Sequence, residues 1–134
     1  MDAYDADNVF LKIINNEVPS TKVYTDEEIL VIMDAFPQEP GHMLVIPRKE
    51  VRNILDIDNS SLNKLILMVK KIANAQIKAF NASGIKIVHN CESAAGQVVF
   101  HAHFHVLPYF AENNEMPTSL DTPEKQALEV AKHL

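Results

Sequence analysis

Residues 99–108 read Val99-Phe100-His101-Ala102-His103-Phe104-His105-Val106-Leu107-Pro108, a stretch with histidines on three alternate residues. The residues between them are apolar and the flanks favour β structure, so the pattern predicts an extended strand. Because successive side chains of a strand point to opposite faces, all three imidazoles are expected on one face. Neighbouring rings then lie about 6.7 Å apart along the backbone, at a rise of about 3.3–3.4 Å per residue. In a helix they would diverge by about 200°, so a strand is what turns this spacing into a candidate site.

Length and composition indicate one globular domain over residues 1–134. Hydrophobic residues make up 47% and charged residues 22% of the chain, as in ordinary globular proteins. No apolar run approaches the roughly 20 residues that cross a bilayer. The acidic start, Met1–Asp7, does not resemble a signal peptide, and the single cysteine, Cys91, cannot form an internal disulfide. We therefore expect a cytoplasmic protein that does not associate with a membrane.

The net charge of −6 argues against a nonspecific nucleic-acid partner, which would bind through a basic face. The one basic cluster, formed by Arg48, Lys49 and Arg52, is interpreted as a solvated turn. A small anionic ligand stays possible, since the local field of a pocket can oppose the charge of the whole protein.

Hydrophobic spacing predicts three helices and about five strands. The helices are expected over residues 8–15, capped by Asp7 or Asn8, over 59–81 as the longest, and over 122–132. The strands are expected at Lys22–Thr25, Leu30–Ala35, His42–Ile46, Ile85–Asn90 and in the histidine stretch. Short links between strands favour an antiparallel sheet with the helices on one side, which is an α+β architecture.

Neutral imidazole is both a metal ligand and a nucleophile, so two chemistries compete for the histidine stretch. In the metal interpretation the histidines converge on zinc or copper, although only Glu92 and Cys91 lie near as further ligands. In the phosphoryl interpretation the middle ring attacks phosphorus, and its neighbours and backbone N–H groups hold the anionic oxygens. A third interpretation, solvent-facing strand residues, is disfavoured by the regular alternation with apolar residues.

The loop before the histidines supports the phosphoryl interpretation. Gly96 allows the backbone to approach a phosphate closely, although a plain turn also explains a glycine there. The side-chain amides of Asn90 and Gln97 are candidates for contacts with sugar or phosphate oxygens.

Three further blocks make the chain similar to the histidine triad (HIT) family of nucleotide hydrolases and transferases. They are FLKIINNEVPS at residues 10–20, VIMD at 31–34 followed by PQEPGHMLVIP at 37–47, and Gly96-Gln97 before the histidines. The blocks occur in the family's order across roughly residues 8–108, which leaves residues 109–134 as a C-terminal extension.

The resemblance implies cleavage of a nucleotide through a covalent nucleotidyl-histidine. His103 matches the nucleophile, while His101 and His105 match the residues that bind and polarise the phosphate, one of them assisting protonation of the leaving group.

The resemblance also implies the contacts with the nucleotide. The matched positions are Asp34 for the ribose hydroxyls, Asn90 and Gln97 for ribose, phosphate or the scissile-bond oxygen, Phe10, Ile13 and Ile32 for the purine pocket, and His42 as support for the catalytic strand. For the three apolar residues core packing explains the residue type equally well, and His42 is equally explained as a buried histidine.

The chain departs from some relatives at three places. Bacterial relatives that hold a structural zinc carry Cys-x-x-Cys where this chain has Asn8 and Leu11, and a histidine where it has Glu50. We therefore expect no metal and no cofactor. Val98 replaces a serine that touches phosphate in the phosphoramidase branch, which leaves only the backbone N–H of Val98 for that contact.

The resulting hypothesis is an enzyme that cleaves purine nucleoside phosphoramidates or related adenylates at the α-phosphate. The alternatives are a dinucleoside polyphosphate hydrolase, a nucleotide-binding protein with weak catalysis, and a metal-binding protein. The resemblance further implies a homodimer, with the long helix and the strand at residues 85–90 as candidate contacts.

Overall fold

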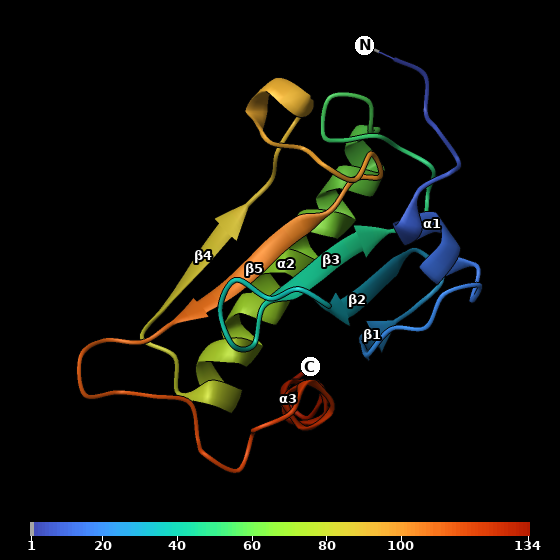
Figure 1. Cartoon of the computed structure of the whole chain (residues 1–134). Helices are drawn as coiled ribbons and strands as arrows, with labels where there is room; N and C mark the ends of the chain where they lie inside the picture. Colours follow the sequence, from blue (N-terminus) through green and yellow to red (C-terminus); the bar gives the residue numbers. More distant parts are fainter. Residues whose placement is uncertain (1) are drawn as a thin grey trace.

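A five-stranded antiparallel sheet forms the centre of the computed structural model, which describes residues 2–134 (Figure 1). The strand order is β1-β2-β3-β5-β4, and every neighbouring pair is antiparallel. The strands are β1 (Lys22–Thr25), β2 (Ile29–Met33), β3 (Met43–Pro47), β4 (Gly84–Val88) and β5 (Phe104–Tyr109). The predicted α+β fold with about five strands is confirmed.

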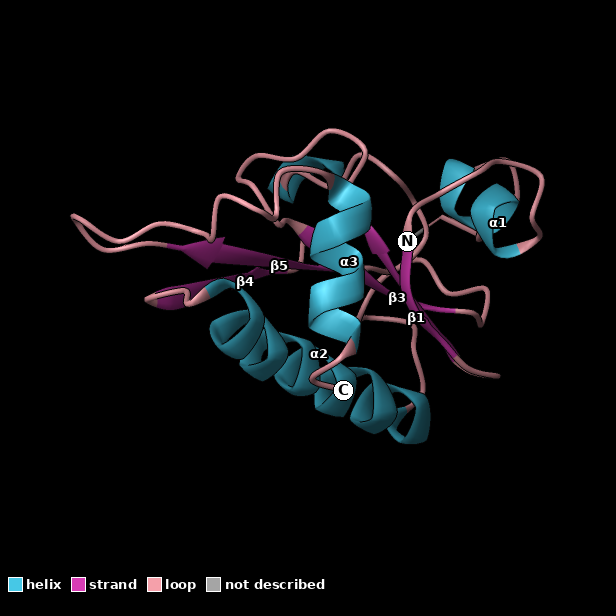
Figure 2. Ribbon diagram, turned by 90° about the horizontal axis from the view of Figure 1, so that it is seen from below, coloured by secondary structure: helices cyan, strands magenta, loops and turns pink. Residues whose placement is uncertain are grey.

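Helices cover both faces of this sheet, with α1 and α2 on opposite sides (Figure 2). The long helix α2 (Asn59–Phe80) and α3 (Pro123–Ala131) pack on one face, and the short α1 (Val9–Ile14) packs on the other. The expectation that all helices share one side is therefore wrong for α1. The reason is that every residue of β2 and β3 is buried, and strands that are apolar on both faces need a cover on both.

Successive side chains of β2 and β3 point to opposite faces of the sheet, so the core is divided into two layers. Val31 and Val45 face the α2 layer, whereas the smaller layer under α1 is built from Phe10, Ile13, Leu30, Ile32, Leu44 and Ile46. Burying a side chain of this size contributes about 1.5–3 kcal/mol relative to leaving it exposed. The smaller layer matters for function because part of it also forms the wall of a cavity.

Polar side chains cap each helix where it begins. Asn8 accepts the Leu11 N–H before α1, and Thr122 accepts the Lys125 N–H before α3, as the sequence predicts. The cap of α2 is Asp58, one residue before the predicted start, and the helix ends at Asn81 in the left-handed conformation. No helix within residues 2–134 has the length and hydropathy needed to span a bilayer.

The strand that carries the histidines is shorter than predicted, since β5 begins only at Phe104. Its ladder with β3 ends at the pair Val45↔Phe104, and its ladder with β4 ends at Val88↔His105. The preceding segment, residues 100–103, lies beyond both ladders and is held by other bonds, such as Ala102 N–H to the Val51 carbonyl at 2.8 Å. His101 and His103 therefore do not share the regular strand geometry of His105.

Candidate active site

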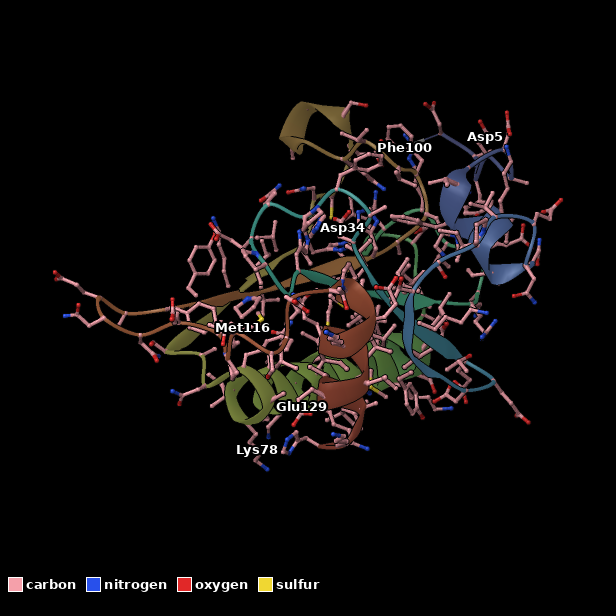
Figure 3. All side chains as sticks on the ribbon, turned by 60° about the horizontal axis from the view of Figure 1, so that its bottom comes forward. Asp5, Asp34, Lys78, Phe100, Met116 and Glu129 are labelled. Atoms are coloured by element: carbon pink, nitrogen blue, oxygen red, sulfur yellow. The ribbon has the colours of Figure 1, made fainter. Side chains whose placement is uncertain are left out.

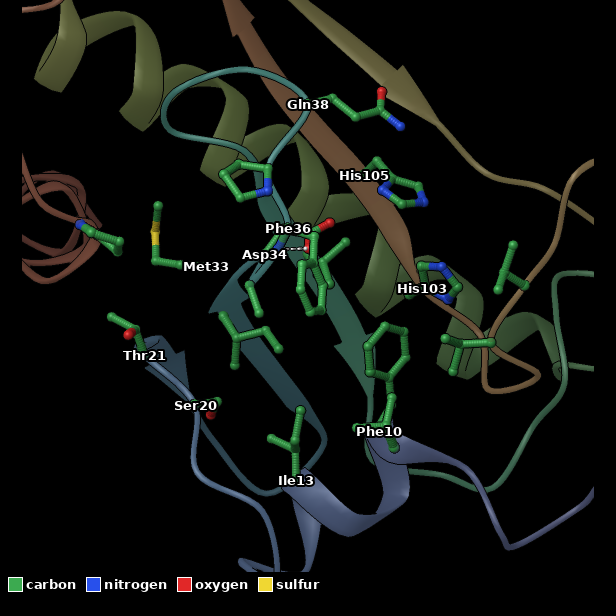
Figure 4. Close-up of a pocket in the computed structure, with 18 of the residues that line it drawn as sticks. Phe10, Ile13, Ser20, Thr21, Met33, Asp34, Phe36, Gln38, His103 and His105 are labelled. Atoms are coloured by element: carbon green, nitrogen blue, oxygen red, sulfur yellow. Dashed lines mark hydrogen bonds between the residues drawn. The ribbon is translucent and has the colours of Figure 1, made fainter.

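A cavity of about 850 Å³ lies between α1, the segment before β1, the end of β2 and the histidine stretch (Figure 4). Side chains that line it include Phe10, Ile13, Ile32, Asp34, Phe36, Asn90, Val98, His103 and His105. Phe36 is one of the lining residues that the sequence did not single out. An apolar cavity with a few polar groups is typical of a small-molecule site.

The neutral ring of His103 is held in one tautomer by its own backbone segment. Its Nδ1 lies 2.7 Å from the His101 carbonyl oxygen, which can only accept, so the proton sits on Nδ1. Burial lowers the pKa of His103 to about 4, so the ring is neutral near neutral pH. Nε2 therefore carries a lone pair at the cavity. The edge of Phe10 packs against the ring, with centroids 4.7 Å apart.

His105 has the opposite tautomer, which follows from a chain of two hydrogen bonds. The backbone N–H of Gln38 donates to Nδ1 of His42 at 3.2 Å, so the neutral His42 ring carries its proton on Nε2. That Nε2–H donates to Nδ1 of His105 at 2.9 Å, which leaves the His105 proton on Nε2. Burial lowers the pKa of both rings and keeps them neutral. His105 thus offers a donor 4.9 Å, ring to ring, from the lone-pair-bearing His103.

The structure does not bring His101 to the cavity, which differs from the expectation that its ring binds phosphate. The side chain is fully buried, and its Nε2–H donates to the Pro47 carbonyl at 2.7 Å. Its Nδ1 accepts the hydroxyl of Tyr4 at 2.5 Å, and that hydroxyl accepts an N–H from Asn8 at 2.9 Å. Burial lowers the pKa of His101 as well. His101 therefore ties the histidine stretch to β3 and to the start of α1.

Gln97 also differs from its expected role, because all its bonds are internal. Its Nε2 donates to the carbonyls of Arg52 and Val99, and its Oε1 accepts from Asn53 and from the Glu92 backbone N–H. The residue is 4% exposed and does not line the cavity. Gln97 shapes the loop around Gly96 rather than contacting a ligand.

An ion pair between Arg52 and Glu92, which the sequence did not predict, also holds this loop. Arg52 donates to the Glu92 carboxylate at 2.8 and 3.0 Å, which lowers the pKa of Glu92. The guanidinium carbon lies 4.2 Å from the ring centroid of Phe100, which Figure 3 labels. The basic cluster interpreted as a solvated turn therefore contains one buried arginine with a structural role.

Asp34 and Phe36 stand at the rim of the cavity (Figure 4). One Asp34 oxygen accepts the Phe36 backbone N–H at 2.9 Å, and the other lies 3.4 Å from Nε2 of His42. Phe36 is 88% exposed although it is aromatic. A carboxylate beside an exposed ring suits a ligand with hydroxyl donors and a flat apolar group.

The remaining predicted residues all line the cavity, and three of them also belong to the core. Phe10, Ile13 and Ile32 are 8%, 7% and 3% exposed and belong to the layer under α1, yet all three line the cavity, so both explanations of these residues hold. Val98 is 83% exposed at the rim, and Asn90 lines the cavity next to Gly96, whose φ is +96°.

Residues 15–112 match the HIT domain family model. The chain belongs to the HIT domain family. An uncharacterized HIT-like protein of Borreliella burgdorferi is 44% identical over 107 residues, which cover 78% of this chain and 76% of that protein. Adenylylsulfatase HINT3 of Arabidopsis thaliana is 37% identical over 102 residues, 76% of this chain and 52% of HINT3.

Solved HIT structures share the fold over nearly the whole chain. A HIT-like protein of Bartonella henselae, described as involved in cell-cycle regulation, is 44% identical with a TM-score of 0.88 and covers 98% of this chain and 100% of its own. A zinc-bound histidine triad protein of Mycobacterium smegmatis is 28% identical with a TM-score of 0.83, covering 95% of this chain and 92% of its own. The fold therefore includes the C-terminal extension at residues 109–134.

One solved HIT structure holds zinc, and a structural ion in this chain would need ligand atoms at the matched positions. At the positions matched to zinc ligands, Leu11 has no donor atom, and both side-chain groups of Asn8 are already bonded to Leu11, Tyr4 and Asp5. Zinc prefers thiolate, imidazole and carboxylate ligands. Of the three matched positions only Glu50 offers such a group, so these residues do not fit a structural zinc.

A second cluster has ligand-like spacing but unsuitable protonation. Asp34, His42 and His105 each offer an atom within 4.8 Å of the others. A metal at Nε2 of His42 would displace the proton to Nδ1, where it would face the Gln38 N–H. The hydrogen bonds of His42 therefore oppose a metal at this cluster.

Acid is expected to destabilise the fold through the buried histidines. Burial lowers the pKa of His103 to about 4 and also lowers the pKa of His42, His89, His101 and His105. An unfolded histidine titrates near pH 6.5, so between about pH 6.5 and pH 4 the unfolded chain binds more protons than the folded chain. The free energy of unfolding therefore decreases as the pH is lowered through this range. For His103 alone the loss is about 3 kcal/mol, at about 1.36 kcal/mol per pKa unit.

Urea denaturation between about pH 7 and pH 4 measures this loss. His103→Asn should make the fall smaller, whereas the control His133→Asn, at an exposed site, should follow the wild type. An equal fall in all three proteins would contradict the assignment of a buried neutral His103.

Proposed function

We propose that this HIT protein is a nucleotide hydrolase or transferase that cleaves purine nucleoside phosphoramidates or related adenylates at the α-phosphate. One observation carries the proposal. Two adjacent rings at the cavity, the buried His103 and the half-buried His105, are neutral and oppositely protonated, His103 with a free lone pair and His105 with a free N–H. Nucleophilic attack on a phosphate and stabilisation of its oxygens need this combination.

The reaction proceeds in two successive displacements at phosphorus. Nε2 of His103 forms an N–P bond, the bond from phosphorus to the leaving group breaks, and its electron pair departs with that group. Nε2–H of His105 donates a hydrogen bond to a phosphate oxygen in this step. Water then forms a P–O bond and loses its proton to solvent, while the N–P electron pair returns to His103.

The rest of the cavity positions the nucleotide. Asp34 accepts hydrogen bonds from the ribose hydroxyls, and the purine occupies the apolar part beside Phe10, Ile13 and Ile32. Phe36, exposed at the rim, supplies a face on which the base can stack. Asn90 lies on the phosphate side with the Gly96 loop.

The hydrogen bonds of His105 favour leaving groups that depart as anions. Its Nδ1 only accepts a hydrogen bond from His42 and carries no proton, so transferring the Nε2 proton outright would leave an imidazolate. Sulfate, carboxylate and pyrophosphate need no such proton, whereas an amine must take one from solvent. This supports mixed anhydrides of a nucleotide, including dinucleoside polyphosphates, as a second candidate class beside phosphoramidates. The name of the relative adenylylsulfatase HINT3 is consistent with it.

We further propose a cytoplasmic homodimer. The strand β4 lies at the edge of the sheet and exposes Ile87 at 50%, and α2 exposes Ile66 at 42% and Ile77 at 38%. An open edge strand with apolar side chains favours pairing with a second copy. Light scattering should give the dimer mass for the wild type and a shift toward monomer for Ile87→Lys. A monomeric wild type at working concentrations would contradict the dimer.

Substitution of His103 tests the function. Wild type and His103→Asn are compared on an adenosine phosphoramidate, an aminoacyl-adenylate, adenylyl sulfate and a diadenosine polyphosphate. Loss of the nucleophile should lower kcat at least about 10³-fold on every substrate, while AMP binding persists. His133→Asn is the control at an exposed site. AMP binding without turnover by the wild type would support a binding protein instead, and near-normal turnover by His103→Asn would refute the nucleophile.

Substitution of Asp34 tests the ribose contact. Asp34→Ala should weaken AMP binding by about 1–3 kcal/mol, the cost of losing charge-assisted hydrogen bonds, and should abolish the preference for AMP over its 2′,3′-dideoxy analogue. Calorimetry measures both, with Asp121→Ala, which removes an exposed ion pair with Lys125, as the control. Equal affinity of the wild type for both nucleotides would rule out this role.

A further inference from the structure

A histidine outside the triad, His89, holds the backbone of the proposed nucleophile. It directly follows β4, and its Nδ1 lies 2.8 Å from the His103 carbonyl oxygen. Its Nε2 lies 2.9 Å from the backbone N of Ile54. Its ring stacks on Phe104, with centroids 4.4 Å apart and planes 19° apart. His89 is not among the residues that line the cavity, and the reaction steps above do not use it.

These contacts occur where the sheet stops supporting the chain. The β4–β5 ladder ends at Val88↔His105, and the β3–β5 ladder ends at Val45↔Phe104, so the peptide of His103 lies just beyond both. The His89 side chain takes over there, donating to the His103 carbonyl as a next ladder bond would. It fixes the peptide from which the attacking ring projects.

Only the neutral Nδ1–H tautomer of His89 can make both bonds. The His103 carbonyl can only accept, so Nδ1 carries the proton, and the Ile54 N–H can only donate, so Nε2 must be bare. The stack on Phe104 fixes the plane of the ring. The two hydrogen bonds and the stack therefore fix the orientation of the His89 ring, and the ring in turn holds two backbone groups.

We infer that His89 is a positioning residue for phosphoryl transfer, acting through the His103 peptide. The inference rests on the proposed function for its kinetic consequence, but not for its geometry. Because His89 is not among the residues that line the cavity, its loss should slow the chemical step without weakening substrate binding. A displacement of an attacking atom by about 1 Å can cost about 10²-fold in rate.

Three substitutions separate the parts of this role. His89→Asn keeps a donor near the Nδ1 position, His89→Gln keeps an acceptor near the Nε2 position, and His89→Phe keeps the stack and loses both bonds. The control is His133→Phe, at an exposed site in the C-terminal segment. Each protein is assayed for kcat, for KM and for the rate at which the nucleotidyl-enzyme is trapped by acid quench, using the best substrate of the wild type.

His89→Phe should lower kcat and the trapping rate about 10²-fold with KM within about threefold, and His89→Asn should restore most of the rate while His89→Gln does not. ¹⁵N spectra of the histidine rings supply a readout independent of turnover. The His103 resonances should move in His89→Phe and His89→Gln and stay near wild type in His89→Asn.

The outcomes distinguish the two proposals. A wild-type rate in His89→Phe, unmoved His103 resonances in that variant, or a rate loss in folded His89→Asn equal to that in His89→Phe would overturn the positioning role. If the wild type itself forms no nucleotidyl-enzyme, the proposed function fails, and the movement of the His103 resonances still decides whether His89 positions that ring.

Discussion

Buried imidazoles must pair their ring nitrogens with groups of fixed polarity, and at this end of the sheet most of those groups belong to the backbone. The carbonyls of Pro47, His101 and His103 can only accept, and the N–H groups of Gln38 and Ile54 can only donate. Leaving such a group unpaired costs about 1–3 kcal/mol, which exceeds the small preference of a free imidazole for either tautomer. The fold therefore sets which nitrogen of each ring carries the proton.

This constraint explains why the regular strand β5 begins only after His101 and His103. If β5 continued through residues 100–103, strand neighbours would use the backbone groups of that segment in ladder bonds. The His101 carbonyl would then be unavailable to fix the ring of His103. The segment is held instead by the backbone bond from Ala102 to Val51 and by the side chains of His101 and His89. Residues that hold the structure and residues that face the cavity are thus drawn from the same few histidines.

Much of the fold followed from local sequence because local periodicity specifies it. Burial is indicated by alternation in the histidine stretch, by apolar runs in β2 and β3 and by the spacing in α2, and the caps at Asn8 and Thr122 act over three residues. The side of the sheet that α1 covers could not be inferred in this way. It depends on β2 and β3 being buried on both faces, which appears in the sequence only as continuous apolar runs.

The candidate site was predictable as a set of residues but less so in their roles. His101 and His103 occupy equivalent places in the alternation, yet one ring is buried against Pro47 and Tyr4 and the other lines the cavity. That difference, like the internal bonding of Gln97, depends on groups 45 to 97 residues away in sequence, which are the carbonyls of Arg52 and Pro47 and the hydroxyl of Tyr4. The resemblance to the family supplied residue types at matched positions. It could not show which donors and acceptors were already used within this chain.

Because the histidines are neutral, the cavity also discriminates between phosphates of different charge. None of the residues that line it within the described part of the chain is lysine or arginine, and the net charge of the protein is −6. An anion there is held by dipoles, chiefly the His105 N–H and nearby amides, which stabilise one negative charge better than two. Under the proposed function the α-phosphate of the substrate bears one charge, whereas the released nucleoside monophosphate bears close to two. A site built from neutral donors therefore favours the substrate over its own product, which a cluster of cations would retain.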